Sequence, residues 1–164
     1  MTVFFTSDTH FGDHRTLNIG KRPLGSVAEM DAVLVANWNA VVGSEDEVWH
    51  LGDVVRRAAD VPDLLARLHG AKHLIAGNND PIQTREAGGW ASERAYHELR
   101  IGDRLLVLCH YPFRSWNGQH RGAINLHGHS HGRMKPLPRQ FDVGVDARDF
   151  RPVSLDQLLS WARS

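Results

Sequence analysis

The strongest constraint on the fold is the alternation of strand-like and helix-like segments in the first half of the chain. Residues 2–7, 47–53 and 72–77 are apolar and rich in residues that favour strands. Between them, residues 26–42 and 61–70 carry apolar side chains at helical spacing, and both begin with a helix-start signal. This order predicts an α/β fold with a layered core.

The second half of the chain contains more strands. Residues 96–102 and 104–110 flank a turn, and residues 123–128 and 140–146 form two further strand-like segments. Residues 154–162 have the pattern of a final helix. Because the chain has 164 residues and no internal repeat or linker, we expect one domain that spans residues 1–164.

Charge, the N-terminal sequence and the cysteine count limit the partners, the location and the site chemistry that we expect for this chain. The formal net charge is zero and there is no basic run, so we expect neither duplex nucleic acid nor an anionic membrane as a partner. The N-terminal sequence MTVFFTSD lacks a basic region before its apolar residues, which favours a cytoplasmic location. The single cysteine, Cys109, leaves no intrachain disulfide and no CxxC zinc site.

Five short polar motifs follow predicted strands, where α/β folds gather ligand-binding groups. They read SDTH, GD, GNND, CHYP and HGHSH. Their potential metal ligands are four imidazoles, two carboxylates and one amide oxygen, from Asp8, His10, Asp53, Asn78, His110, His129 and His131. This mixture of nitrogen and oxygen suits borderline divalent ions such as Mn, Fe, Zn, Co or Ni. The set is large enough for two ions that share one carboxylate.

The series D-x-H, G-D, G-N, H and G-H-x-H over residues 8–131 resembles the calcineurin-like metallophosphoesterases, and in particular a small bacterial and phage branch of them. The resemblance implies a four-layer α-β-β-α sandwich with two mixed β-sheets. It implies one metal ion held by Asp8, His10, Asp53 and His131, and a second held by Asp53, Asn78, His110 and His129. We favour manganese for both ions, with Fe, Zn, Ni or Co as alternatives.

The same resemblance implies hydrolysis of phosphate esters. Two cations lower the pKa of a bound water molecule, so a hydroxide that bridges the ions is the expected nucleophile. The site stays positive after two aspartates and one hydroxide are counted, which suits an anionic phosphoryl group. The expected substrate is a small phosphorylated molecule, with a nucleotide as one option.

Asn79 departs from the family pattern. The turn usually reads G-N-H-D, and its histidine acts as a general acid or as a hydrogen-bond donor to phosphate. An amide donates hydrogen bonds but does not release a proton near pH 7. Because small phosphodiesterases of the family often replace this histidine, the departure favours a phosphodiesterase.

Alternatives to a phosphodiesterase stay open at this point. A phosphomonoesterase would need another proton donor, for which His14, His50 and His120 are the candidates. A catalytically weak protein could instead use the metal-bound fold as a scaffold that binds a partner protein. Saturated coordination would indicate a purely structural metal site.

Three further residues carry predictions of their own. Arg114 is a candidate contact to a phosphate oxygen, and Trp116 is a candidate for stacking on a base. Asp80 lies directly before Pro81, an arrangement that predicts the N-cap of a helix.

Overall fold

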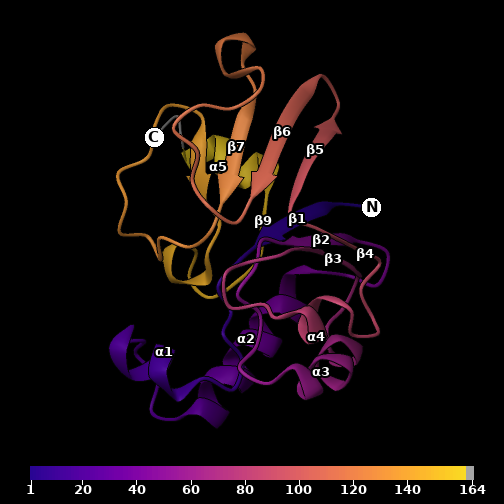
Figure 1. Cartoon of the computed structure of the whole chain (residues 1–164), viewed down its shortest axis with the longest axis vertical. Helices are drawn as coiled ribbons and strands as arrows, with labels where there is room; N and C mark the ends of the chain where they lie inside the picture. The colour runs from indigo at the N-terminus through magenta and orange to yellow at the C-terminus, as the bar shows by residue number, and fades with distance from the viewer. Residues whose placement is uncertain (162–164) are drawn as a thin grey trace.

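The protein, described here over residues 1–161 of a computed structural model, contains two β-sheets that pack face to face (Figure 1). The strands of the first sheet are β1 (Val3–Thr6), β2 (Glu47–His50), β3 (Ala71–Ile75), β4 (Ser92–Arg94) and β9 (Val153–Ser154), in the order β4-β3-β2-β1-β9. Those of the second are β5 (Tyr96–Ile101), β6 (Arg104–Cys109), β7 (Ile124–His127) and β8 (Gln140–Asp142), in the order β5-β6-β7-β8.

Both sheets are mixed. Strands β1, β2, β3 and β4 are parallel neighbours, and β9 runs antiparallel to β1. In the second sheet β5 is antiparallel to β6, whereas β6, β7 and β8 are parallel. The predicted α/β fold with two mixed sheets is therefore confirmed.

The helices are short except for one. They are α1 (His14–Ile19), α2 (Val27–Val41), α3 (Val61–Arg67), α4 (Ile82–Arg85) and α5 (Leu155–Trp161), together with the 3-10 helices η1 (Ala58–Asp60), η2 (Gln119–Arg121) and η3 (Val145–Ala147). The predicted cap of α2 is present, because the Ser26 hydroxyl accepts a hydrogen bond from the Glu29 backbone N–H at 3.1 Å. Among residues 1–161, no helix is long and apolar enough to cross a membrane.

Alternating side chains divide the core into layers. On β1 and β2, Phe5 and Trp49 point toward the second sheet and join a cluster that includes Leu106 and Leu126. The opposite face of the first sheet packs on helices α2 and α3 in a separate apolar cluster. The outer face of the second sheet has a thinner cover, because Val107 packs there on the irregular segment that precedes β7.

Helix α1 lies between the first predicted strand and the first predicted helix, in a segment for which the sequence patterns predict no element. Helix α1 begins after Asp13, whose carboxylate accepts hydrogen bonds from the Arg15 backbone N–H at 2.9 Å and the Thr16 hydroxyl at 3.1 Å. Of its residues only Leu17 is buried, so the helix has no apolar periodicity to reveal it. The segment between β1 and α2 therefore contains a short capped helix that its composition does not indicate.

The two sheets approach closely at Gly128, directly after β7. A Cβ atom at this position would overlap the Ser7 hydroxyl and the Asp8 carboxylate. Ser7 also contacts the segment after β8, the edge strand of the second sheet, because its carbonyl accepts a hydrogen bond from the Val145 N–H at 3.0 Å. The end of β7 can therefore lie against the end of β1 only where no side chain intervenes.

We predict that Gly128→Ala lowers the free energy of unfolding by about 1–3 kcal/mol, because the added methyl group forces the two sheets apart. Chemical denaturation of the metal-free protein measures this change. Gly88→Ala is the matched control, since nothing lies within 4 Å of a Cβ at Gly88. Equal stability of the two variants would contradict a close contact at Gly128.

Candidate metal centre

The structure brings together all seven side chains that the motifs predict as metal ligands. Each follows the carboxyl end of a strand: Asp8 and His10 follow β1, Asp53 follows β2, Asn78 follows β3, His110 follows β6, and His129 and His131 follow β7. The ends of the two sheets meet because the Asp8 carboxylate accepts a hydrogen bond from the His129 backbone N–H at 2.9 Å. One cluster thus combines residues from both sheets.

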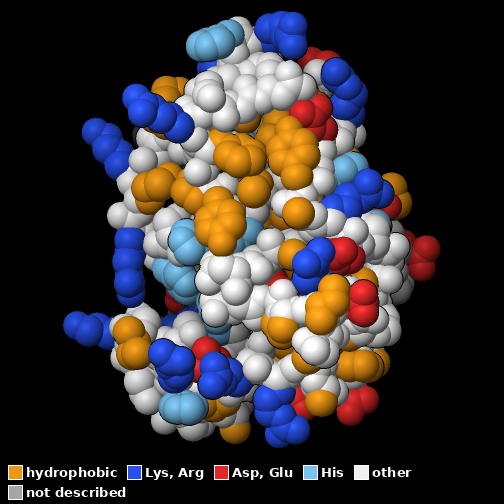
Figure 2. All heavy atoms as spheres, in the orientation of Figure 1, with side chains coloured by type: hydrophobic (Ala, Val, Ile, Leu, Met, Phe, Trp, Pro, Cys, Tyr) orange, Lys and Arg blue, Asp and Glu red, His pale blue; other side chains and the backbone are white. Residues whose placement is uncertain are grey.

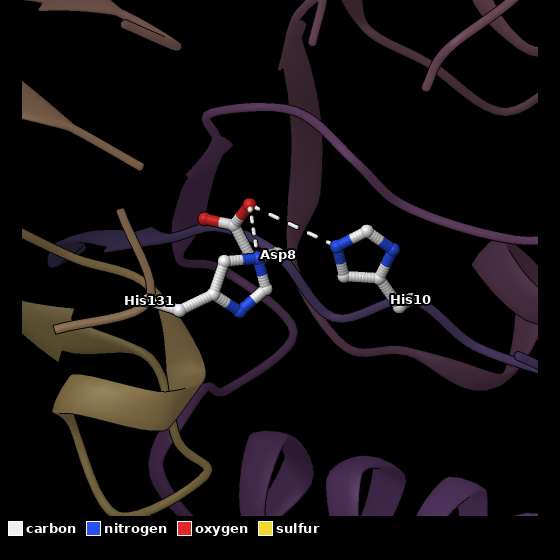
Figure 3. Close-up of side chains that lie close together, drawn as sticks. All are labelled: Asp8, His10 and His131. Atoms are coloured by element: carbon white, nitrogen blue, oxygen red, sulfur yellow. Dashed lines mark ion pairs between the residues drawn. The ribbon is translucent and has the colours of Figure 1, made fainter. Parts of the chain in front are cut away.

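The first half of the cluster is centred on Asp8 (Figure 3). Its Oδ1 lies 3.9 Å from Nε2 of His10 and 3.6 Å from Nε2 of His131, and both imidazoles point toward it. The two rings stack with centroids 5.4 Å apart. Asp53 closes this half, with Oδ2 at 3.6 Å from Nε2 of His10.

The second half of the cluster uses the other oxygen of Asp53. Its Oδ1 lies 3.7 Å from Nε2 of His110. Oδ1 of Asn78 lies 2.9 Å from the same nitrogen and 2.9 Å from Nδ1 of His129. The two oxygens of Asp53 therefore face different sets of side chains.

Two of the imidazoles have their tautomers fixed by hydrogen bonds on Nδ1. In His110, Nδ1 lies 2.6 Å from the carbonyl oxygen of Leu51, which can only accept, so this nitrogen carries the proton. In His131, Nδ1 donates to Oδ2 of Asp146 at 2.7 Å. Both residues consequently present an Nε2 lone pair to the cluster in their neutral form, as a metal ligand must.

Two polar atoms in the cluster are buried without a hydrogen-bond partner among the described residues. Oδ1 of Asp8 and Nε2 of His10 form no hydrogen bond. Burial raises the pKa of Asp8 and lowers the pKa of His10. Unpaired carboxylate and imidazole groups are unfavourable in the interior unless a cation or hydrogen-bond donor lies between them. The donor set therefore fits divalent metal ions.

Left-handed backbone conformations are concentrated at the cluster. Non-glycine residues with positive φ include Asp8 (56°), His10 (49°), Asp53 (59°), His129 (67°) and His131 (49°). Such conformations are uncommon for residues with a Cβ atom, and they tend to gather at functional sites. They turn the chain sharply after each strand, so that neighbouring side chains point back at one centre.

Asp80 holds the turn that contains Asp53. Its carboxylate accepts hydrogen bonds from the backbone N–H groups of Asp53 at 2.7 Å, Val54 at 3.0 Å and Gly77 at 2.8 Å. The predicted N-cap role is wrong, because α4 is capped at Pro81 without a side-chain hydrogen bond. The three N–H groups come from two different turns and bind both carboxylate oxygens, so Asp80 joins these turns instead of capping the helix.

Arg22 and Asp146 support the cluster although no motif indicates them. Arg22 is buried and donates to the backbone carbonyls of Asp8 at 2.6 Å and Thr9 at 2.8 Å. It also binds Asp146 through two hydrogen bonds, at 2.9 and 3.0 Å. Although burial opposes it, hydrogen bonds from His131 and Arg22 lower the pKa of Asp146 to about 2. Asp146 is thus ionised where it orients His131.

His50 joins the turns after β1 and β2 through hydrogen bonds and is not placed to donate a proton to a substrate. It is 1% exposed, and burial lowers its pKa to about 3. Its Nδ1 accepts a hydrogen bond from the Gly52 N–H at 3.2 Å, so Nε2 carries the proton and donates to the Thr9 hydroxyl at 2.9 Å. Both ring nitrogens are therefore occupied inside the protein.

Among residues 1–161, no hydrogen bond, ion pair or ring contact joins the other candidates from the sequence to the cluster. His14 and Arg114 are exposed, and within residues 1–161 neither side chain forms a hydrogen bond or an ion pair. His120 is exposed in η2, which precedes β7 and so lies at the opposite end of that strand from the cluster. The stacking role of Trp116 is wrong, because its ring is buried and its indole N–H donates to the Ala123 carbonyl at 3.0 Å.

An open cavity of about 260 Å³ lies beside the cluster, and Asn79 forms part of its wall. Asn79 is held by the shared carboxylate, since its backbone N–H donates to Oδ1 of Asp53 at 2.8 Å and its side-chain amide donates to Oδ2 at 2.7 Å. The histidines that line the cavity are His10 and His131, both members of the cluster. No other described histidine is positioned there.

Comparison with known proteins identifies the family. The model of the calcineurin-like phosphoesterase superfamily domain matches residues 1–136. An uncharacterized protein of Methanocaldococcus jannaschii is 29% identical, with 96% of this chain and 89% of that protein covered. The gene 66 protein of Mycobacterium phage D29 is 32% identical, with 88% of each chain covered.

A solved structure has the same fold. The crystal structure of a protein of unknown function from Aquifex aeolicus aligns with a TM-score of 0.78 and 20% sequence identity, covering 98% of each chain. At this identity the likeness concerns the fold alone. The family model, in contrast, covers all five motifs of the cluster. The chain belongs to the calcineurin-like phosphoesterase superfamily, whose members are metal-dependent hydrolases of phosphate esters.

Proposed function

We propose that this protein is a phosphodiesterase that uses two divalent ions, preferably manganese, to hydrolyse a small phosphorylated substrate such as a nucleotide. The observation that carries the two-ion proposal is the position of Asp53, whose oxygens face His10 at 3.6 Å and His110 at 3.7 Å. A carboxylate in this position is able to bridge two cations.

Each half of the cluster supplies the ligands of one ion in this proposal. Asp8, His10, Asp53 and His131 would hold the first ion, and Asp53, Asn78, His110 and His129 would hold the second. Bound ions would supply Lewis-acid polarisation of the phosphoryl oxygens and would lower the pKa of a water molecule that serves as the nucleophile. Asn78 contributes an amide oxygen, which adds no negative charge to repel the substrate.

The surrounding residues orient these ligands. The Leu51 carbonyl keeps the proton of His110 on Nδ1, and the Asp146 carboxylate does the same for His131. The Nε2 atom of each neutral ring therefore carries no proton and has a lone pair for a metal ion. Asn79 donates to both oxygens of Asp53 and so fixes the rotation of its carboxylate. The protein residues therefore position the reaction rather than act as nucleophiles.

The absence of a spare acid along the described cavity wall favours diesters. In a phosphomonoester the bond to the leaving oxygen is largely broken at the transition state, so charge gathers there and a proton donor has most effect. In a diester, attack at phosphorus is further advanced and less charge gathers on the leaving oxygen. Asn79 cannot protonate that oxygen, and His10 and His131 serve as ligands in this proposal.

We predict that Asp53→Asn reduces the number of tightly bound manganese ions from two to at most one. The substitution keeps the shape of the side chain but removes the charge that two cations share. Elemental analysis after dialysis gives the stoichiometry. Asp103→Asn, a change at an exposed residue outside the cluster, is the control and should bind as the unmodified protein does. Two tightly bound ions in Asp53→Asn would contradict the bridging role.

We predict that Asp146→Asn lowers the affinity of one of the two manganese sites by about 10- to 100-fold, because His131 loses the carboxylate that fixes its tautomer. Calorimetric titration with manganese should show one weakened and one unchanged site. If both sites weaken equally, the substitution has disturbed the whole fold and the orienting role is not supported.

We predict a higher kcat/KM for bis-p-nitrophenyl phosphate than for p-nitrophenyl phosphate with the manganese-loaded protein. The two compounds share a leaving group, so the comparison isolates the diester from the monoester. Faster hydrolysis of the monoester would reject the phosphodiesterase assignment. If neither compound is hydrolysed with any of the proposed metals, the result would favour the metal-bound scaffold over the enzyme.

The same assay includes a variant with the missing acid restored. Asn79→His should raise hydrolysis of phenyl phosphate, which has a poor leaving group, by about 10-fold or more relative to p-nitrophenyl phosphate. Asn79→Ala is the matched control, because it removes the hydrogen bond to Asp53 without adding an acid. Identical leaving-group dependence in the two variants would argue against a missing proton donor at this position.

A further inference from the structure

The cavity beside the metal centre has a basic wall. Three arginines line it together with His10 and His131: Arg15 from α1, Arg56 from the segment after β2, and Arg133 from the segment after β7. Figure 2 shows a group of histidine side chains at the left of the molecule, with several Lys and Arg side chains beside and below it. Three separate segments therefore place positive charge around one opening.

These arginines form no close ion pairs, although Arg56 lies near enough to Asp13 to contribute to the lowered pKa of its carboxyl group. Within residues 1–161, none of the three guanidinium groups forms an ion pair or a hydrogen bond with the protein, and all three residues are exposed. Other arginines in the chain are paired, as Arg85 is with Glu93 at 2.7 Å and Arg22 is with Asp146 at 2.9 Å. The donors at the cavity are thus free to bind an anion.

The single carboxylate in the cavity wall does not neutralise them. Asp13 uses Oδ1 to accept from the Arg15 backbone N–H and Oδ2 to accept from the Thr16 hydroxyl, which caps α1. The wall therefore holds three positive charges against one negative charge. This excess is local, because the whole chain has a formal net charge of zero.

Building on the proposed function, we propose that the substrate carries a second phosphate group, which Arg15, Arg56 and Arg133 bind beside the reacting phosphoryl group. In the proposed function the ions balance the charge of the reacting phosphoryl group. A substrate with only that phosphate would leave the three arginines without an anion to bind. Guanidinium groups bind phosphate oxygens through paired, charge-assisted hydrogen bonds. The preferred substrate class is a phosphodiester with an additional phosphate monoester.

Two nucleotide esters test this assignment. Thymidine 5′-p-nitrophenyl phosphate and its 3′-phosphorylated derivative share nucleoside, reacting group and leaving group, and differ only in the additional phosphate. We expect the derivative to have a kcat/KM about 10-fold or more above that of the parent ester. Alanine substitution of Arg15, Arg56 or Arg133 should lower the value for the derivative by about 3- to 10-fold and leave the parent ester nearly unchanged.

Arg104→Ala and Arg121→Ala are the matched controls, because both residues line a separate cavity bounded by the start of β6 and the segment before β7. An equal loss in these controls would show general electrostatic attraction and overturn the assignment. Equal kcat/KM for the two esters in the unmodified protein would also overturn it, while hydrolysis of the parent ester would still support the proposed function.

A binding measurement separates the two proposals if neither ester is hydrolysed. Calorimetry with manganese-loaded protein compares thymidine 3′,5′-bisphosphate with thymidine 5′-monophosphate. Tighter binding of the bisphosphate that is lost in Arg15→Ala, Arg56→Ala and Arg133→Ala would support the arginine site even though the catalytic proposal had failed. Equal binding of the two nucleotides would reject the site.

Discussion

The carboxylate of Asp53, shared between two groups of side chains, is the interaction on which the rest of the site depends. One oxygen faces His10 from the first sheet and the other faces His110 from the second. A buried carboxylate is unfavourable unless it is paired and held by hydrogen bonds. Asn79 donates to both of its oxygens, and Asp80 accepts from its backbone N–H. The turn after β3 therefore fixes the position and orientation of Asp53.

The strained turns explain why the cluster lies at strand ends. Residues with positive φ, among them Asp8, Asp53 and His129, cost of order 1–3 kcal/mol each and persist only where the surrounding structure determines them. Parallel hydrogen bonding holds the strands before each turn, and apolar packing between the sheets prevents the turns from relaxing. The same packing requires Gly128 where β7 meets β1. The rigid sheets thus determine the geometry of the cluster.

Sequence could predict most strands and the five motifs because both depend on local patterns: apolar runs for strands, and polar residues directly after them. It missed the short strands β4 and β9, and the two-sheet arrangement followed from the family resemblance. It could not predict Arg22 and Asp146, which are single residues 124 positions apart and meet only in the folded chain. It misassigned Asp80, whose position before proline fits a local cap although tertiary N–H groups bind its carboxylate instead. For Trp116 the aromatic side chain indicated stacking, whereas burial decides its role.

The proposed chemistry and the proposed specificity rest on different parts of the molecule. The cluster residues follow the ends of five strands, and Asp8, His10, Asp53 and His110 are buried, so a change in any of these four disturbs several neighbours. Arg15, Arg56 and Arg133 are exposed and without side-chain partners among the described residues. Replacing one of them alters charge at the cavity but leaves the core packing intact. This separation would allow substrate preference to change through surface residues while the same buried centre performs the hydrolysis.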